Sequence, residues 1–346
     1  MTSPVASCAA CGVELAPGML ACPACRKLVH GDELKRLAAA AEAAEKEGRL
    51  TETLSHWRGA LSLLPPGTRQ HEAVSAHVRR VSEAVDRVGT APPPPPRGRL
   101  GQATAGLGAA GLLLWKLKFV FVSLLGKGKL LLTGLTSIPT LLSMFAWLAL
   151  DRSRGVSFAV GIVASIYVHE MGHVWALRLY GIKATAPMFV PGLGALVRLK
   201  EYPIDAREDA RVGLAGPVWG CAAALVALGF GLALSNRTLL GVASIGAMIN
   251  VFNLIPVWQL DGARGFRALG AGQRTIVCVL AAATALLSGQ PLGWAVCLVG
   301  LGRRRSDLPD KPDARAFWTF ASLLVELALS GWLATIGHEL PPPAEG

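Results

Sequence analysis

Long apolar segments fill the chain after residue 107, and they constrain its fold more than any other feature. The 346 residues are 52% hydrophobic and only 16% charged, with a mean hydropathy of +0.45. Soluble domains carry about 25% charged residues, so these values predict a mainly α, polytopic helical membrane protein with a soluble part. The expected membrane segments, about six or seven in number, are Leu131–Leu150, Val156–Tyr180, Val212–Leu234, Leu239–Val257, a broken pair at Thr275–Leu287 and Leu292–Leu301, and Phe317–Ile336.

Positive charge between the apolar segments predicts their orientation. The formal net charge is +11, and the cytosolic loops of membrane proteins are enriched in Lys and Arg. With the N-terminus in the cytosol, the loops Arg198–Arg211, Arg264–Arg274 and Arg303–Arg305 fall inside, provided that the broken pair forms a hairpin; the loop with Arg152 and Arg154 is the exception. We therefore expect an integral protein of the bacterial plasma (inner) membrane with a cytosolic N-terminus. The soluble part is nearly balanced in charge, so we expect no nucleic-acid partner.

Four cysteines near the N-terminus form two CxxC units. Cys8, Cys11, Cys22 and Cys25 provide two thiolate pairs separated by ten residues, a spacing typical of a four-cysteine zinc site. No basic start followed by an apolar run precedes them, which favours a reducing cytosol and zinc over disulfides. Residues 1–31 are therefore predicted to be a zinc ribbon, in which one structural zinc ion supplies much of the folding energy.

The next segment, residues 32–90, is predicted to be a soluble helical segment. It resembles one tetratricopeptide repeat, although a plain amphipathic helical hairpin fits as well, and either would suit contact with a protein partner. The residues that carry the likeness are Leu37, Ala41, Ala44, Gly48, Trp57, Ala60 and Pro65. The expected parts that follow are a Pro-rich linker at 91–106, an interfacial amphipathic helix at 107–133, a membrane core at 134–303, and a C-terminal membrane helix and tail at 304–346.

A pentapeptide with metal-binding spacing interrupts the second apolar segment. His169-Glu170-Met171-Gly172-His173 places both imidazoles on one helix face, because residues four apart are neighbours there. Glu170 lies between them, where it can take a proton from water at the metal. A charged residue deep in an apolar helix costs roughly 2.5–3.5 kcal/mol, so this motif indicates a functional site. The spacing predicts zinc-dependent hydrolysis inside a membrane.

Catalytic zinc needs a third protein ligand, and Asp261 is the leading candidate. It follows an apolar helix that Pro256 breaks, so unwound backbone can deliver a carboxylate at membrane depth. An Asp-Gly pair alone more often marks a turn. Glu326 is the other acidic residue well inside an expected span, but it lacks comparable flanking residues.

These two elements together resemble the site-2 protease family of intramembrane zinc metalloproteases. The resemblance rests on His169–His173 and on the Asn-x-x-Pro…Asp-Gly pattern of Asn253–Gly262, and it covers about residues 112–300. It implies that His169, His173 and Asp261 bind the catalytic zinc and that Glu170 is general base and acid. It also implies that Asn253 is a catalytic residue that hydrogen-bonds the substrate or the developing oxyanion.

The chain departs from the family pattern at Gln259, often proline, and at Ala263, often a second glycine. Neither position is a ligand, so the departures concern local loop shape. Between the motifs lies an extended-looking segment with Gly194, Ala195, Leu196 and Val197, which we expect to bind substrate by main-chain pairing; a simple interfacial hairpin fits equally well.

The sequence thus predicts an enzyme, an intramembrane zinc metalloprotease that holds one catalytic and one structural zinc ion. Its expected partners are a membrane-protein substrate, the lipid bilayer and a protein bound by the N-terminal unit. One alternative is a membrane zinc hydrolase with a non-peptide substrate. The other is a catalytically silent scaffold, against which the intact Glu170 argues.

Overall fold

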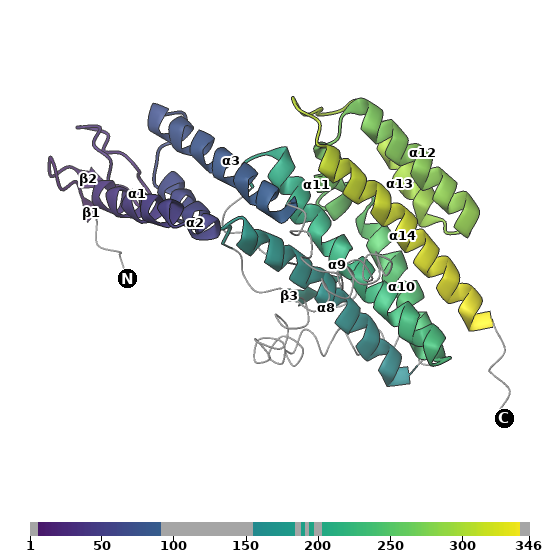
Figure 1. The fold of residues 1–346 in the computed structure, drawn as a ribbon. Helices are drawn as coiled ribbons and strands as arrows, with labels where there is room; N and C mark the ends of the chain where they lie inside the picture. The colour runs from purple at the N-terminus through teal and green to yellow at the C-terminus, as the bar shows by residue number, and fades with distance from the viewer. Residues whose placement is uncertain (1–5, 91–154, 184–187, 191–193, 197–202, 340–346) are drawn as a thin grey trace, which may run out of the picture.

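A computed structural model describes residues 6–90, 155–183, 188–190, 194–196 and 203–339 (Figure 1). The Pro-rich linker, the interfacial helix and the first expected span, Leu131–Leu150, lie outside these residues, as does Val197. The expectations for these parts therefore stay predictions.

The membrane part is a bundle of packed apolar helices (Figure 1). Four of the described helices are long and apolar enough to cross a membrane, by length and composition: α8, α9, α12 and the residues Ala314–Gly337 of α14. The total of six or seven spans stays a prediction. The helices of this part are α8 (Gly155–Leu179), α9 (Ala206–Ala233), α10 (Arg237–Asn253), α11 (Asp261–Arg267), α12 (Ala271–Ser288), α13 (Leu292–Gly302) and α14 (Ala314–Glu339).

The outward surfaces of these helices are apolar. Large apolar side chains, which a water-soluble protein would bury, are more than half exposed on four different helices. This arrangement fits a lipid environment. They include Phe230, Leu286, Leu287, Leu298 and Trp318. The buried core of the bundle is shared by α9 to α14.

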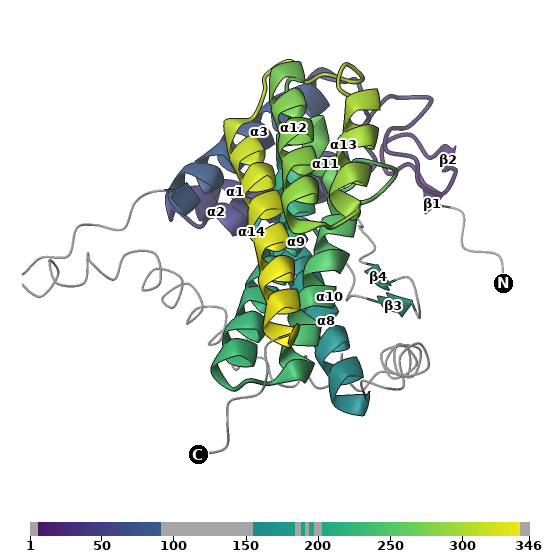
Figure 2. The same cartoon turned by 90° about the vertical axis from the view of Figure 1, so that its right-hand side faces the viewer.

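The broken pair of apolar segments forms a hairpin, as the arginine distribution predicts. Helices α12 and α13 pack together, and Gly289 ends α12 in the left-handed conformation that reverses the chain. The fully buried Arg274, in the first turn of α12, donates to the carbonyl oxygen of Arg303 just after α13, at 3.0 Å. The start of α12 and the end of α13 therefore lie at the same end of the bundle (Figure 2).

The N-terminal unit begins with a two-stranded hairpin, β1 (Ala6–Ser7) and β2 (Glu14–Leu15), and continues with α1 (Gly31–Lys46), α2 (Leu50–Ser62) and α3 (Arg69–Thr90). Within this unit α1 packs against α2, and α2 packs against α3. A single three-helix unit of this kind does not establish a tetratricopeptide repeat.

Helices α2 and α3 are not held apart from the membrane bundle. Leu54, Val78, Val81 and Val85 share one buried cluster with residues at the end of α8 and the start of α9. The N-terminal helices thus lie at one end of the bundle, the end where α8 finishes and α9 begins (Figure 1).

A small antiparallel hairpin follows α8. Strand β3 (Met188–Val190) pairs with β4 (Gly194–Leu196), with Phe189 opposite Ala195, and β4 contacts α8. The extended-looking segment of the sequence therefore does form a strand pair beside the helix that carries the histidines.

Candidate metal centre

Helix α8 carries the pentapeptide with both histidines on one face. His169, Glu170 and His173 are each less than 8% exposed. Their ligand atoms lie within 4.8 Å of one another. His173 stands six residues, about 9 Å, before the end of α8, so the motif lies nearer the end of the bundle that contacts the N-terminal helices.

Asp261 reaches the two histidines from the start of α11. Its Oδ2 lies 3.1 Å from Nε2 of His169, and its Oδ1 lies 3.2 Å from Nε2 of His173. The chain between α10 and α11 is unwound around Pro256, as the sequence predicts. Gly262 allows the approach, because a side chain there would collide with the backbone of Leu254. The structure therefore brings together three residues that are far apart in the sequence.

The outer nitrogen of each ring is held by an acceptor. Nδ1 of His169 lies 2.8 Å from Oδ1 of Asn250, and Nδ1 of His173 lies 2.8 Å from the carbonyl oxygen of Val212. The Val212 carbonyl can only accept, so Nδ1 of His173 carries the proton; the amide of Asn250 donates to the Gly246 carbonyl, which leaves its oxygen to accept from His169. Each Nε2 then has a free lone pair.

The donor set fits a zinc ion. The two Nε2 atoms, 3.2 Å apart, and the Asp261 carboxylate present only lone pairs and negative charge to one another. A cation between them would satisfy all three, and two His with one carboxylate is a donor set of catalytic zinc. Gly216 of α9 keeps the space open, because a Cβ there would press on both Nε2 atoms.

Asn250 is a residue that the sequence analysis missed. It is 2% exposed and stands one turn before Asn253, the residue that the family resemblance singled out. Asn253 is the last residue of α10 and is partly buried, and its catalytic role stays a prediction. An amide side chain in an otherwise apolar helix, one turn before Asn253, is the signal that could have identified Asn250.

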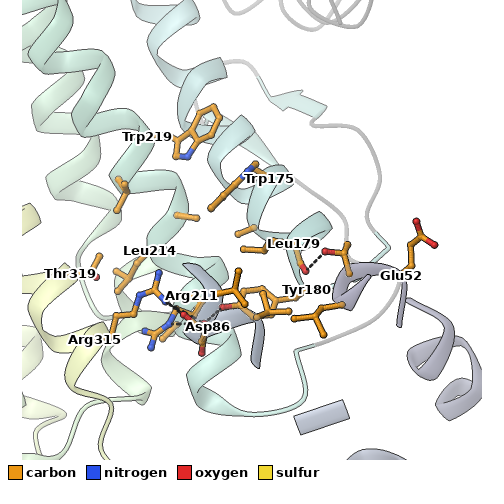
Figure 3. A pocket seen from close by; sticks show the side chains of 18 of the residues that line it. Glu52, Asp86, Trp175, Leu179, Tyr180, Arg211, Leu214, Trp219, Arg315 and Thr319 are labelled. Atoms are coloured by element: carbon orange, nitrogen blue, oxygen red, sulfur yellow. Dashed lines mark hydrogen bonds and ion pairs between the residues drawn. The ribbon is translucent and has the colours of Figure 1, made fainter. Parts of the chain in front are cut away.

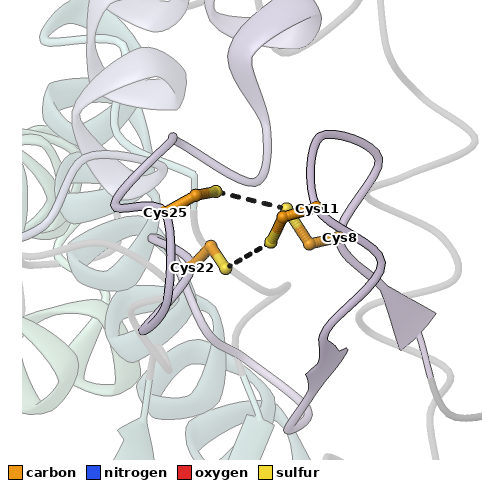
Figure 4. Close-up of side chains that lie close together, drawn as sticks. All are labelled: Cys8, Cys11, Cys22 and Cys25. Atoms are coloured by element: carbon orange, nitrogen blue, oxygen red, sulfur yellow. Dashed lines mark hydrogen bonds between the residues drawn. The ribbon is translucent and has the colours of Figure 1, made fainter.

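The four cysteines of the N-terminal unit also converge (Figure 4). The Sγ atoms of Cys8 and Cys25 lie 3.7 Å apart, and those of Cys11 and Cys22 lie 3.5 Å apart. Tetrahedral zinc with Zn–S bonds of about 2.3 Å requires sulfurs about 3.8 Å apart, so the cluster fits one ion. Hydrogen bonds from backbone N–H groups, the largest from Cys25, lower the pKa of the Cys22 thiol to about 6 and favour its thiolate, whereas the neighbouring thiols of Cys25 and Cys22 raise the pKa of Cys11.

Comparison with known proteins agrees with this geometry. Residues 157–240 match peptidase family M50, a match that begins in the first turn of α8 and ends in the first turn of α10. It includes the pentapeptide and Gly216 but not Asp261. This part of the chain is thus similar to peptidase family M50, within a mainly helical architecture that has membrane-type helices.

Several curated proteins that resemble the chain are named as zinc metalloproteases. The chain is 29% identical over 113 residues to the zinc metalloprotease MJ0392 of Methanocaldococcus jannaschii, covering 31% of this chain and 32% of that protein. It is 27% identical over 250 residues to "Probable zinc metalloprotease EGY2, chloroplastic" of Oryza sativa subsp. indica, covering 58% and 46%. For "Probable zinc metalloprotease EGY1, chloroplastic" of Arabidopsis thaliana the identity is 24% over 223 residues, covering 49% and 40%.

The chain spans about a third to a half of the length of these relatives. No solved structure gives a significant match. The family match and the relatives' names thus make the chain similar to zinc metalloproteases, and its four apolar helices fit a membrane protein.

Proposed function

We propose that this protein is an intramembrane zinc metalloprotease that hydrolyses peptide bonds of membrane-protein substrates within or near the bilayer, in regulated intramembrane proteolysis. One observation carries the proposal: the Nε2 atoms of His169 and His173, on the membrane-length helix α8, converge with the carboxylate of Asp261 inside a bundle of apolar helices. Glu170 stands beside them on the same helix.

The residues divide the chemistry between them. His169, His173 and Asp261 would hold the zinc ion, which when bound lowers the pKa of water toward neutral and polarises a carbonyl. Glu170 accepts a proton from the attacking water and returns it to the leaving amine, as general base and then general acid. Asn253 hydrogen-bonds the substrate or the developing oxyanion.

The substrate enters as extended chain, because a helix shields its own carbonyls. Strand β4 beside α8 supports this route, since a strand edge can pair with a peptide through main-chain hydrogen bonds. Gly194, Ala195, Leu196 and Val197 are the positions that we assign to this pairing.

The location is part of the same proposal. The N-terminal unit, the start of α12 and the end of α13 lie at one end of the bundle, the end that carries the arginine-rich loops. This grouping supports a cytosolic N-terminus by the positive-inside rule, in the bacterial inner membrane expected from the sequence. The N-terminal ribbon and helices remain candidates for binding a protein partner, and their four cysteines for a second, structural zinc ion.

The test uses a Glu170→Gln variant of the full chain in its membrane. Membrane fragments are compared by mass spectrometry between cells with the wild-type protein and cells with the variant. A single-span protein that is cleaved only when Glu170 is intact would identify the substrate. Cleavage of a confirmed substrate at the wild-type rate by Glu170→Gln would refute the proposal.

A further inference from the structure

The first two turns of α9 connect the N-terminal helices to the metal centre. At 28 residues α9 is about 42 Å long, whereas the hydrocarbon core of a bilayer is about 30 Å thick. Its first turns can therefore stand outside the apolar layer. Asp205 caps the helix by accepting from the backbone N–H of Glu208 at 2.8 Å, which fixes where the helix begins.

Arg58 of α2 forms a buried ion pair with Glu208. Its Nη2 lies 2.6 Å from Oε1 of Glu208, and the two side chains are 4% and 0% exposed. Nε of Arg58 also donates to the carbonyl oxygen of Tyr180, just after α8, at 2.9 Å. Ser82 of α3 donates to the same Oε1 at 2.6 Å. One arginine of the N-terminal unit thus holds both the end of α8 and the start of α9.

The end of α8 fits closely against α2. Gly181 adopts the left-handed conformation with φ of 64°, and a Cβ there would lie 2.6 Å from the backbone nitrogen of Ser55. The hydroxyl of Thr51 donates to the carbonyl oxygen of Leu179 at 3.3 Å. These contacts show that docking of α2 specifies the path of the chain as it leaves α8.

Beside this tight contact, the interface between the N-terminal helices and the membrane bundle contains a cavity. A cavity of about 950 Å³ lies between the N-terminal helices and α8, α9 and α14, with Trp175 and Trp219 at one end (Figure 3). At its other end, Oδ1 of Asp86 on α3 lies 3.5 Å from Nε of Arg211 on α9. The same oxygen accepts from the Tyr180 hydroxyl at 2.5 Å. These polar contacts at the edge of the cavity add to the buried apolar cluster that α2 and α3 share with α8 and α9.

Residues of α9 close to Glu208 contact the elements that carry the metal ligands. The next residue, Asp209, accepts from Arg264 of α11 at 2.8 Å, and Arg264 stands one turn after Asp261. One turn after Glu208, the carbonyl of Val212 holds the ring of His173. The first two turns of α9 thus contact the N-terminal unit, the helix of Asp261 and the ring of His173.

We propose that Arg58 is a positioning residue for the metal centre. By docking α2 and α3 on the end of α8 and the first turn of α9, it fixes the position of α9 relative to α8. The Val212 carbonyl and the His169–His173 face then keep the relative positions that zinc binding requires. The inference rests on the metal site of the proposed function, but not on peptide hydrolysis.

The test measures zinc binding by the full-length chain in detergent, so that it stands apart from any failure to find protease activity. Zinc is titrated against a chelator, and Asp261→Ala identifies which step belongs to the catalytic site. Arg58→Met should weaken that step about tenfold, within the range found for residues that orient metal ligands, and Arg58→Lys should weaken it less. Arg36→Met is the matched control, since Arg36 pairs with Glu33 on the exposed face of α1, and it should bind zinc like the wild type.

Amide hydrogen exchange supplies the second readout. In Arg58→Met, exchange should accelerate at the end of α8 and in the first turns of α9, together with the loss of zinc affinity. Faster exchange with wild-type zinc affinity would overturn the proposal, because docking would then be lost without effect on the centre. If Arg58→Met does not fold, Ser82→Ala removes one contact to Glu208, and the same pair of measurements applies to it.

Discussion

Among the residues that the structure describes there are two clusters of metal-type ligands, and they are built in opposite ways. The four cysteines lie 17 positions apart at most, in the hairpin and the segment that follows it, and the buried residues there form a separate cluster of their own. His169 and Asp261 are 92 positions apart, and both are buried where α8, α9, α10 and α11 meet. The first cluster would fold around its metal, whereas the second is assembled by the packing of helices.

This difference teaches which contacts each site depends on. The cysteine cluster needs its own loop and little else, because local turns bring the thiols together. In the helical centre, the ligand rings are oriented by Asn250 and Val212, and space for the ion depends on Gly216. Substitutions far from the ligands in sequence should therefore affect the helical centre and leave the ribbon unchanged.

The largest effect is expected from Glu170→Gln. This change removes the general base while keeping the shape of the side chain, so cleavage of a membrane substrate should fall by about 10²–10⁴-fold. Zinc content should stay at the wild-type value, because Glu170 is not assigned as a ligand. The control is Glu326→Gln on α14, which lies outside the centre and should cleave normally.

Asp261→Ala should separate the two sites by their metal content. Loss of one of three protein ligands should lower bound zinc from two ions per chain toward one, as measured by elemental analysis after dialysis. The remaining ion would belong to the cysteines. Unchanged stoichiometry would remove Asp261 from the ligands.

Asn250→Ala should weaken zinc binding at the helical centre by about 10–100-fold, since the ring of His169 loses the acceptor that orients it. Asn253→Ala is the comparison, because its proposed partner is the substrate. It should lower the rate of cleavage while zinc affinity stays constant. Equal loss of zinc affinity in both variants would contradict this division of roles.

The smallest effect concerns the pH at which the ribbon loses zinc. The pKa of Cys22 is lowered to about 6, so its thiolate persists at neutral pH. The stability contributed by this thiolate is present above the ordinary thiol pKa of about 9 and is lost as the pH falls through about 6. In Asp261→Ala, which should retain only the ribbon zinc, zinc affinity should therefore fall progressively as the pH drops from about 9, and release should be complete only below about pH 6. Release that is complete at pH 8 would contradict the assignment.

Much of the candidate site could be predicted from the sequence because its parts are local. The helical repeat alone places His169 and His173 on one face, and the break at Pro256 predicts unwound backbone before Asp261. The hairpin α12–α13 followed from the arginines at its two ends and from the break between its halves. The sequence analysis did not anticipate that α2 and α3 would pack on the bundle, because the proline run suggested a spacer.

By itself, the sequence determined which residue types are available and which of them share a helix face or a turn, since these depend on backbone geometry within a few residues. Only the tertiary structure decided that Asn250 and Val212 hold the histidine rings and that Arg58 contacts Glu208. Such pairs join elements far apart in the chain. Their distances are set by how whole helices pack, because no local repeat relates residues on different elements.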